Sequence, residues 1–167
     1  GDLRGAVESY REVLAGRAAA ADAAGSEAEL SLLAQCRTNL GSALNSLGHN
    51  QEAAEHLRKA VATLRLLTRH FPREPGHRNG LAKALHNLGS TQRDQGAAAA
   101  AEQLYREAAA VERKLVGEFP GVPEYQADLA NHLNQLATRL RLSGRRGEAE
   151  PLYREAVAAA GRAARGR

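Results

Sequence analysis

The chain has 167 residues, a length that fits a single domain with a buried core. Lysine and arginine number 23 against 19 aspartates and glutamates, so the formal net charge of +4 does not by itself indicate a nucleic-acid partner. No apolar run approaches the roughly 18 residues of a membrane span, and a single cysteine, Cys36, excludes a disulfide framework within the chain. We therefore expect a cytoplasmic protein.

The composition favours helices over sheets. Alanine is the commonest residue, while tryptophan and methionine are absent and the aromatic residues are four tyrosines and two phenylalanines. Such a chain suits close helix packing and is poor in the residues that build strands. Because it lacks methionine and opens on Gly1, we expect it to be part of a longer protein.

The chain repeats itself at a constant interval of 48 residues. Asn39-Leu40-Gly41 recurs as Asn87-Leu88-Gly89, and Gln135-Leu136-Ala137 stands at the third position. The same interval relates three turn glycines, Gly48, Gly96 and Gly144. The interval predicts that residues 1–25 are the second helix of a truncated repeat. Three full units follow, at residues 26–72, 73–120 and 121–167. An internal period of this length is typical of solenoids.

Each unit reads as two helices. In the first unit, apolar residues recur at steps of three and four from Leu33 to Leu47 and again from Ala53 to Leu67. Gly48 can take a positive φ between them, and Pro72 must end the second helix near Phe71. Pro75 or Gly76 then opens the next helix. Two further residues predict a capping box at the start of the first full helix, Ser26 and Glu29.

The small residues in these helices have a packing explanation. Gly41 and Gly89 sit in mid-helix, where glycine costs up to about 1 kcal/mol relative to alanine. That cost is offset if a neighbouring helix comes too close for a larger side chain. Each hairpin leaves one apolar face uncovered, so the units must stack side by side to bury it.

These residues resemble a tetratricopeptide repeat array. Such repeats carry a Leu-Gly pair in the first helix, a glycine at the turn, and alanine, an aromatic residue and alanine in the second helix. Leu40-Gly41, Gly48, Ala53 and Ala60 fit, and the second unit adds the aromatic residue, Tyr105. The period of 48 rather than about 34 implies longer helices. The long form is similar to kinesin-light-chain-like repeats and to repeat tails of bacterial regulatory proteins.

The resemblance implies an all-α fold: a right-handed α-solenoid of antiparallel hairpins with about seven long helices. In this family the first helix of each unit lines a concave groove. The corresponding positions here are Gln35, Thr38, Asn39, Ser42, Asn45, Lys83, His86, Asn87, Ser90, Arg93, Asn131, Asn134, Gln135, Thr138 and Arg141.

This set of side chains is polar and rich in amides. Carboxamides donate and accept hydrogen bonds together, so a row of them can pair with the backbone of an extended peptide. We expect a non-enzymatic protein-binding scaffold that holds a peptide or flexible segment, with Lys83, Arg93 and Arg141 favouring acidic partners. In the alternative interpretation these are solvated polar positions, and the array is a structural spacer or a self-association element.

Other functions find little support in the sequence. The family's two-carboxylate clamp for chaperone tails needs lysines, asparagines and an arginine where this chain has Thr38, Ser42, Ser90, Asn134 and Thr138. Cys36 lies on an apolar stripe, and we expect it to be buried rather than nucleophilic. No two histidines have the spacing of metal ligands, and we expect His86 to be a solvated groove residue. We expect no cofactor, metal, small-molecule substrate or nucleic acid.

Overall fold

The computed structural model describes the backbone of residues 2–24 and 26–166, and the side chains of residues 2–16 and 26–166. In this part of the chain there are seven α-helices and no strands, so the predicted all-α fold is confirmed. The unit ends predicted at Gly1, Gly25 and Arg167 lie outside the described residues. The helices are α1 Leu3–Ala24, α2 Glu27–Ser46, α3 Asn50–His70, α4 Pro75–Asp94, α5 Ala98–Glu118, α6 Pro123–Leu142 and α7 Arg146–Arg165.

The helices start at the interval that the sequence predicts. The first helices of the three units, α2, α4 and α6, begin at Glu27, Pro75 and Pro123, each one repeat interval after the one before. The second helices, α3, α5 and α7, keep the same spacing. Because no residue is inserted or lost, equivalent positions of successive units can be compared directly.

The ends of the helices follow from local chemistry. The three turn glycines have φ values of +83°, +80° and +80°, a region that residues with a Cβ rarely adopt. The N-cap Ser26 and Glu29 form the predicted capping box, in which the Glu29 amide donates to Ser26 Oγ and the Ser26 amide donates to Glu29 Oε2 at 2.9 Å. Helix α3 ends at His70, just before the Phe71-Pro72 pair.

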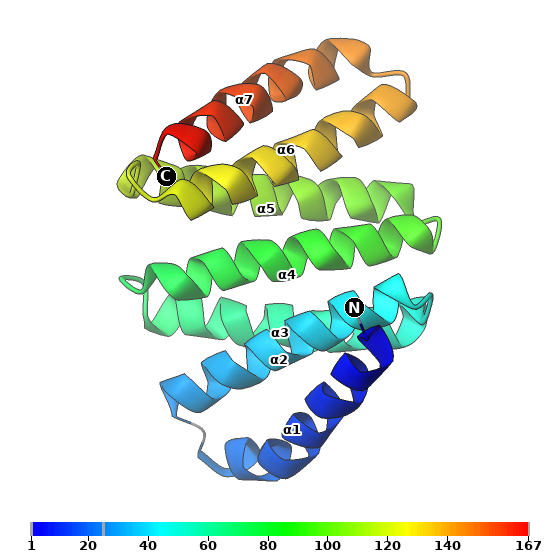
Figure 1. The fold of residues 1–167 in the computed structure, drawn as a ribbon, viewed down its shortest axis with the longest axis vertical. Helices are drawn as coiled ribbons and strands as arrows, with labels where there is room; N and C mark the ends of the chain where they lie inside the picture. Colours follow the sequence, from blue (N-terminus) through cyan, green and yellow to red (C-terminus); the bar gives the residue numbers. More distant parts are fainter. Residues whose placement is uncertain (1, 25, 167) are drawn as a thin grey trace.

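The hairpins stack into two layers (Figure 1). Helices α2, α4 and α6 form one layer, and α3 and α5 lie behind them. Each helix packs against the next one in the chain, and α2 also contacts α4. The molecule is therefore a helical solenoid, as the sequence predicts. No described helix is apolar over a stretch long enough to cross a bilayer.

The core consists of four mainly aliphatic clusters, each of which joins neighbouring helices. Leu57, Leu64 and Leu67 of α3 pack against Leu85 and Leu88 of α4 in a buried cluster. Each such leucine contributes on the order of 2 kcal/mol when it is fully removed from water. Cys36 is buried with Leu40 and Leu44, as predicted.

The mid-helix glycines mark close helix contacts, as predicted. A Cβ at Gly41 would lie 2.5 Å from Leu57 Cγ and 3.1 Å from the Ala53 carbonyl oxygen. A Cβ at Gly89 would lie 2.9 Å from Tyr105 Cε1. In the first two full hairpins the two helices therefore lie too close together for a side chain larger than glycine at this position.

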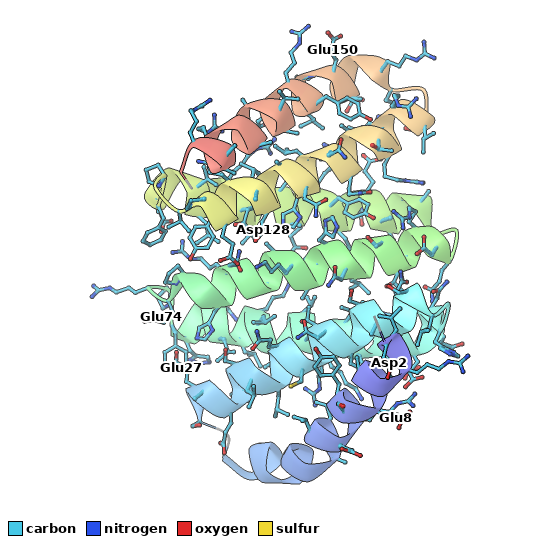
Figure 2. The ribbon with its side chains drawn as sticks, in the orientation of Figure 1. Asp2, Glu8, Glu27, Glu74, Asp128 and Glu150 are labelled. Carbon is cyan, nitrogen blue, oxygen red and sulfur yellow. The ribbon has the colours of Figure 1, made fainter. Side chains whose placement is uncertain are left out.

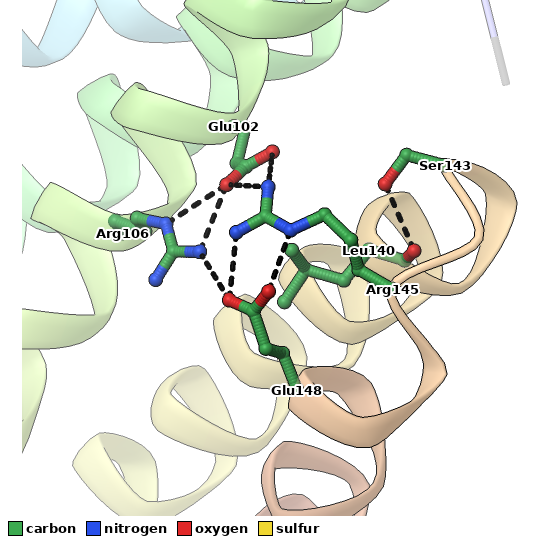
Figure 3. Close-up of polar contacts among 6 residues, drawn as sticks. All are labelled: Glu102, Arg106, Leu140, Ser143, Arg145 and Glu148. Atoms are coloured by element: carbon green, nitrogen blue, oxygen red, sulfur yellow. Dashed lines mark hydrogen bonds and ion pairs between the residues drawn. The ribbon is translucent and has the colours of Figure 1, made fainter.

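Exposed ion pairs connect the last two units (Figure 3). Arg145 donates to Glu102 at 2.8 Å and to Glu148 at 2.7 Å, while Arg106 donates to Glu102 and reaches Glu148. These pairs join the start of α7 to α5. Because most of these side chains are exposed, the pairs contribute little stability compared with the leucine core.

The glycine contacts predict opposite effects for two equal substitutions. Gly41→Ala should lower the free energy of unfolding by about 1–3 kcal/mol, because the new methyl group collides with Leu57. Gly117→Ala should leave it unchanged or raise it by up to about 1 kcal/mol, since a Cβ there meets nothing within 4 Å. Chemical denaturation followed by circular dichroism measures both, and equal effects would contradict the close-contact explanation.

Candidate peptide-binding groove

Two pockets follow one another along the line between α2 and α4. The first pocket has a volume of about 430 Å³ and is lined mainly by residues 31–39 of α2 and 76–83 of α4. The second pocket, of about 230 Å³, is lined by residues 42–46 of α2 and 87–93 of α4. Together they form a groove between the first helices of the first two units.

Nine of the fifteen predicted groove residues line these pockets. Four lie in the first pocket: Gln35, Thr38, Asn39 and Lys83. Five lie in the second pocket: Ser42, Asn45, Asn87, Ser90 and Arg93. The remaining six line neither of the two: His86, Asn131, Asn134, Gln135, Thr138 and Arg141.

Several amide side chains in the groove have unused hydrogen-bonding capacity. Gln35 and Asn39 are exposed and Asn87 is partly exposed, and none of the three side chains forms a hydrogen bond with another described residue. Thr38 differs, because its hydroxyl donates to the Ala34 carbonyl oxygen at 2.8 Å. The amides are therefore available to a ligand backbone.

The groove lysine, Lys83, already forms ion pairs within the protein. Lys83 Nζ lies 2.7 Å from Glu124 Oε1 and 3.1 Å from Asp128 Oδ2, both on α6. Burial alone would lower the pKa of Lys83, but these two carboxylates raise it overall. The expectation that Lys83 attracts acidic side chains is not met by this arrangement.

Arg93 is held in a similar way in the second pocket. Its Nε donates to Asp94 Oδ1 at 2.8 Å, and the side chain of Asn45 donates to Asp94 Oδ2 at 2.9 Å. Burial alone would raise the pKa of Asp94, but these hydrogen bonds lower it overall. Arg93 also approaches Gln135 Oε1 at 3.5 Å.

Two of the predicted hydroxyl groups connect the helices of their own hairpin. Ser90 Oγ lies 3.1 Å from the Tyr105 hydroxyl, and Thr138 Oγ1 lies 3.0 Å from the Tyr153 hydroxyl. The two pairs are equivalent in successive units. The first unit has Leu57 in place of the tyrosine, so Ser42 has no such partner and is exposed. On α6, the side chains of Asn131, Asn134 and Arg141 are exposed.

His86 is not the solvated residue that the sequence suggests. Its Nδ1 lies 2.9 Å from Nδ1 of His132, a residue of α6 that is only 2% exposed. A hydrogen bond between two ring nitrogens requires one to carry the proton and the other to accept it. Burial lowers the pKa of His86 to about 4 and that of His132 to about 3, so both rings are neutral near pH 7.

A buried glutamate completes this cluster. Glu112 of α5 is fully buried, and its Oε2 lies 3.9 Å from His132 Nε2. The side chain of Asn79 donates to Glu112 Oε1 at 3.4 Å and to Asp128 Oδ2 at 3.0 Å. Burial, with the nearby charge of Asp128, raises the pKa of Glu112 to about 8, so the carboxyl is largely protonated at pH 7.

Sequence reasoning missed this cluster, although a signal was present. Glu112 stands at the position that Leu64 holds one unit earlier, and His132 stands at the position that Ala84 holds. A polar residue at an apolar position of the repeat indicates a buried polar contact between units. In the described ranges no group of three or more histidine, cysteine, aspartate or glutamate side chains is arranged to hold a metal ion.

Stacked two-helix units with a polar groove between α2 and α4 define a helical repeat protein of the solenoid class. The family model described as tetratricopeptide repeat matches residues 33–67, 81–120 and 129–164. The chain belongs to the tetratricopeptide repeat family, whose repeats generally mediate protein–protein interactions and are not catalytic. No curated protein is significantly similar to the chain.

The buried glutamate predicts a pH-dependent effect of Glu112→Gln. A folded-state pKa raised from 4.5 to about 8 gives stability that is fully present below pH 4.5 and is lost as the pH rises through 8. Glutamine stays neutral, so the variant should match the wild type near pH 4.5. It should exceed the wild type by roughly 2–5 kcal/mol at pH 9.

Denaturant unfolding at several pH values measures this difference. Glu55→Gln, at an exposed position of α3 where the carboxylate forms no ion pair with a described residue, is the control and should show no such trend. His86 and His132 have lowered pKa values, so they reduce the stability of the protein below pH 6.5. Both remain in every variant, and this effect therefore largely cancels in the comparison. A constant difference between pH 4.5 and 9 would show that Glu112 is ionised in the fold.

Proposed function

We propose that the chain binds an extended segment of a partner protein in the groove between α2 and α4. The observation that carries this proposal is the set of unpaired amides, Gln35, Asn39 and Asn87, along two consecutive pockets. Each carboxamide can donate to a backbone carbonyl and accept from a backbone amide, so binding would not depend on one partner sequence. The membership of an interaction-repeat family supports the same function.

The dimensions suit a short peptide. The pockets extend along α2 from Ser31 to Ser46, which corresponds to about 22 Å of helix at 1.5 Å per residue. An extended segment of about seven residues covers that length. Lys83 and Arg93 already have carboxylate partners, so the proposed recognition relies on main-chain hydrogen bonds rather than on an acidic motif.

A displayed library of random 12-residue peptides tests this function. Peptides selected on the wild-type protein would be labelled, and their affinities measured by fluorescence anisotropy. The double variant Asn39→Ala, Asn87→Ala should bind about 30-fold more weakly, because each lost hydrogen bond contributes about 1 kcal/mol.

A matched double variant removes two amides elsewhere. Gln51→Ala, Gln103→Ala changes exposed side chains on α3 and α5, outside both pockets, and should keep the wild-type affinity. Equal affinities for the two double variants, or a failure to select any peptide, would contradict groove binding.

A second candidate function, self-association, has one observation in its favour. Val157 on α7 is 74% exposed and Leu142 at the end of α6 is 64% exposed, so the last hairpin leaves apolar side chains in water. A copy of the chain that packed there would cover them.

Light scattering across a range of concentrations tests self-association. The wild-type mass should rise with concentration, and Val157→Arg should keep the protein monomeric because a charge would be buried in the interface. A monomer at every concentration for the wild type excludes this candidate.

A further inference from the structure

The first pocket exists because of two glycines that the other units lack. Gly76 and Gly80, one turn apart on α4, both line it. A Cβ at Gly76 would meet nothing within 4 Å, and a Cβ at Gly80 would lie 3.1 Å from Leu64 Cδ2. The equivalent residues are Ala28 and Leu32 in the first unit and Glu124 and Asp128 in the third. The pocket is therefore a property of one junction and not of the repeat.

The junction between α4 and α6 shows which side chains fill the equivalent space when the two glycines are replaced. There Glu124 and Asp128 hold the ammonium group of Lys83, whose equivalent one unit earlier is Gln35. A long cation thus lies against two carboxylates between α4 and α6. Between α2 and α4 the equivalent positions hold Gly76, Gly80 and Gln35, so this ion pair has no counterpart there and an open cavity remains.

The charges around the cavity are unbalanced. Glu74 and Glu124 line it together with Lys83 and His77. Lys83 is already shared between Glu124 and Asp128, and His77 Nε2 lies 2.9 Å from Glu27 Oε1. The Glu74 carboxylate makes no hydrogen bond or ion pair with any residue that the structure describes. Figure 2 shows Glu27 and Glu74 on the same side of the molecule, near the starts of α2 and α4, with Asp128 of α6 above them. Negative charge therefore exceeds positive charge at this end of the groove.

The remaining lining is suited to a long side chain with a polar tip. Leu64 supplies an apolar surface beside Gly80, and the side-chain carbonyl oxygens of Gln35 and Asn39 can accept hydrogen bonds. Arginine combines three methylene groups with a planar cation that has five donors, so it can use the apolar surface, the amides and the carboxylates together.

We propose that the first pocket holds an arginine side chain of the bound segment. This inference rests on the proposed function, and it reverses the acidic preference that the sequence suggests. The guanidinium group donates to Glu74 and to the amide oxygens of the groove, while its methylene groups lie against Leu64.

Titration of the ¹⁵N-labelled protein with small probes tests the pocket directly. The probes are the Nα-acetyl methylamides of arginine, citrulline and glutamate; citrulline has nearly the same shape as arginine but no charge. The arginine probe should give saturable shifts of the Gly76 and Gly80 amide signals, and the citrulline probe should bind about tenfold more weakly. The glutamate probe should give none.

Two glycine variants test whether the arginine probe binds in the first pocket. Gly76→Leu fills the pocket and should abolish the shifts at Gly80. Gly147→Leu is the matched control, because Gly147 is also the second residue of its helix and also has nothing within 4 Å of a Cβ. Glu74→Gln removes only the charge and should weaken the arginine probe, which keeps the test decisive if Gly76→Leu does not fold.

The two proposals fail in different ways. Equal binding of arginine and citrulline, unchanged binding to Gly76→Leu, or no shift at Gly76 and Gly80 overturns the arginine pocket. If selected peptides still lose affinity in the Asn39→Ala, Asn87→Ala variant, the groove stands without it. If the arginine probe binds as expected but no peptide depends on those amides, the pocket stands and the groove function fails.

Discussion

The structure depends on the fact that a single helical hairpin cannot bury its own apolar face. Leu64 and Leu67 of α3 lie in one buried cluster with Leu85 and Leu88 of α4, so their full burial requires the next unit to pack on them. The same requirement holds at every junction, so the units stack in one direction. Stacking in turn places the polar sides of α2 and α4 next to each other, and this arrangement creates the groove.

Within the first two full hairpins the close approach of the two helices depends on a glycine opposite the bulky side chain. Gly41 accepts Leu57, and Gly89 accepts Tyr105. Once a tyrosine occupies that position, its hydroxyl reaches the polar edge of the first helix and pairs with Ser90. The tyrosine in the core thereby engages the hydroxyl of one groove residue, whereas the leucine of the first unit leaves the Ser42 hydroxyl without such a partner.

The pocket, the ion-paired lysine and the buried polar cluster all lie at positions where the units differ from one another. Glycines at positions 76 and 80 open a pocket at one junction, whereas carboxylates at 124 and 128 close the equivalent space with an ion-paired lysine. At that second junction Glu112 and His132 replace apolar residues and form a buried polar cluster. The regular positions hold the solenoid together, and the irregular ones distinguish one surface from another.

The sequence alone was enough for the helices, their ends and their order. The constant repeat interval, the turn glycines and the Phe-Pro pairs act over a few neighbouring residues or by exact repetition, and both are visible in one chain. Nine of the fifteen predicted groove residues also line the pockets, because helix periodicity decides which side of α2 and α4 they occupy.

Only the tertiary structure decided which of these side chains remain available. Lys83 is paired with two carboxylates of the next unit, and His86 contacts a histidine 46 positions away. Such pairings depend on the distance and stagger between neighbouring hairpins, which are set by the volumes of packed side chains rather than by any local pattern. For this reason the sequence could predict nine residues that line the two pockets but could not determine which of their charges are already paired.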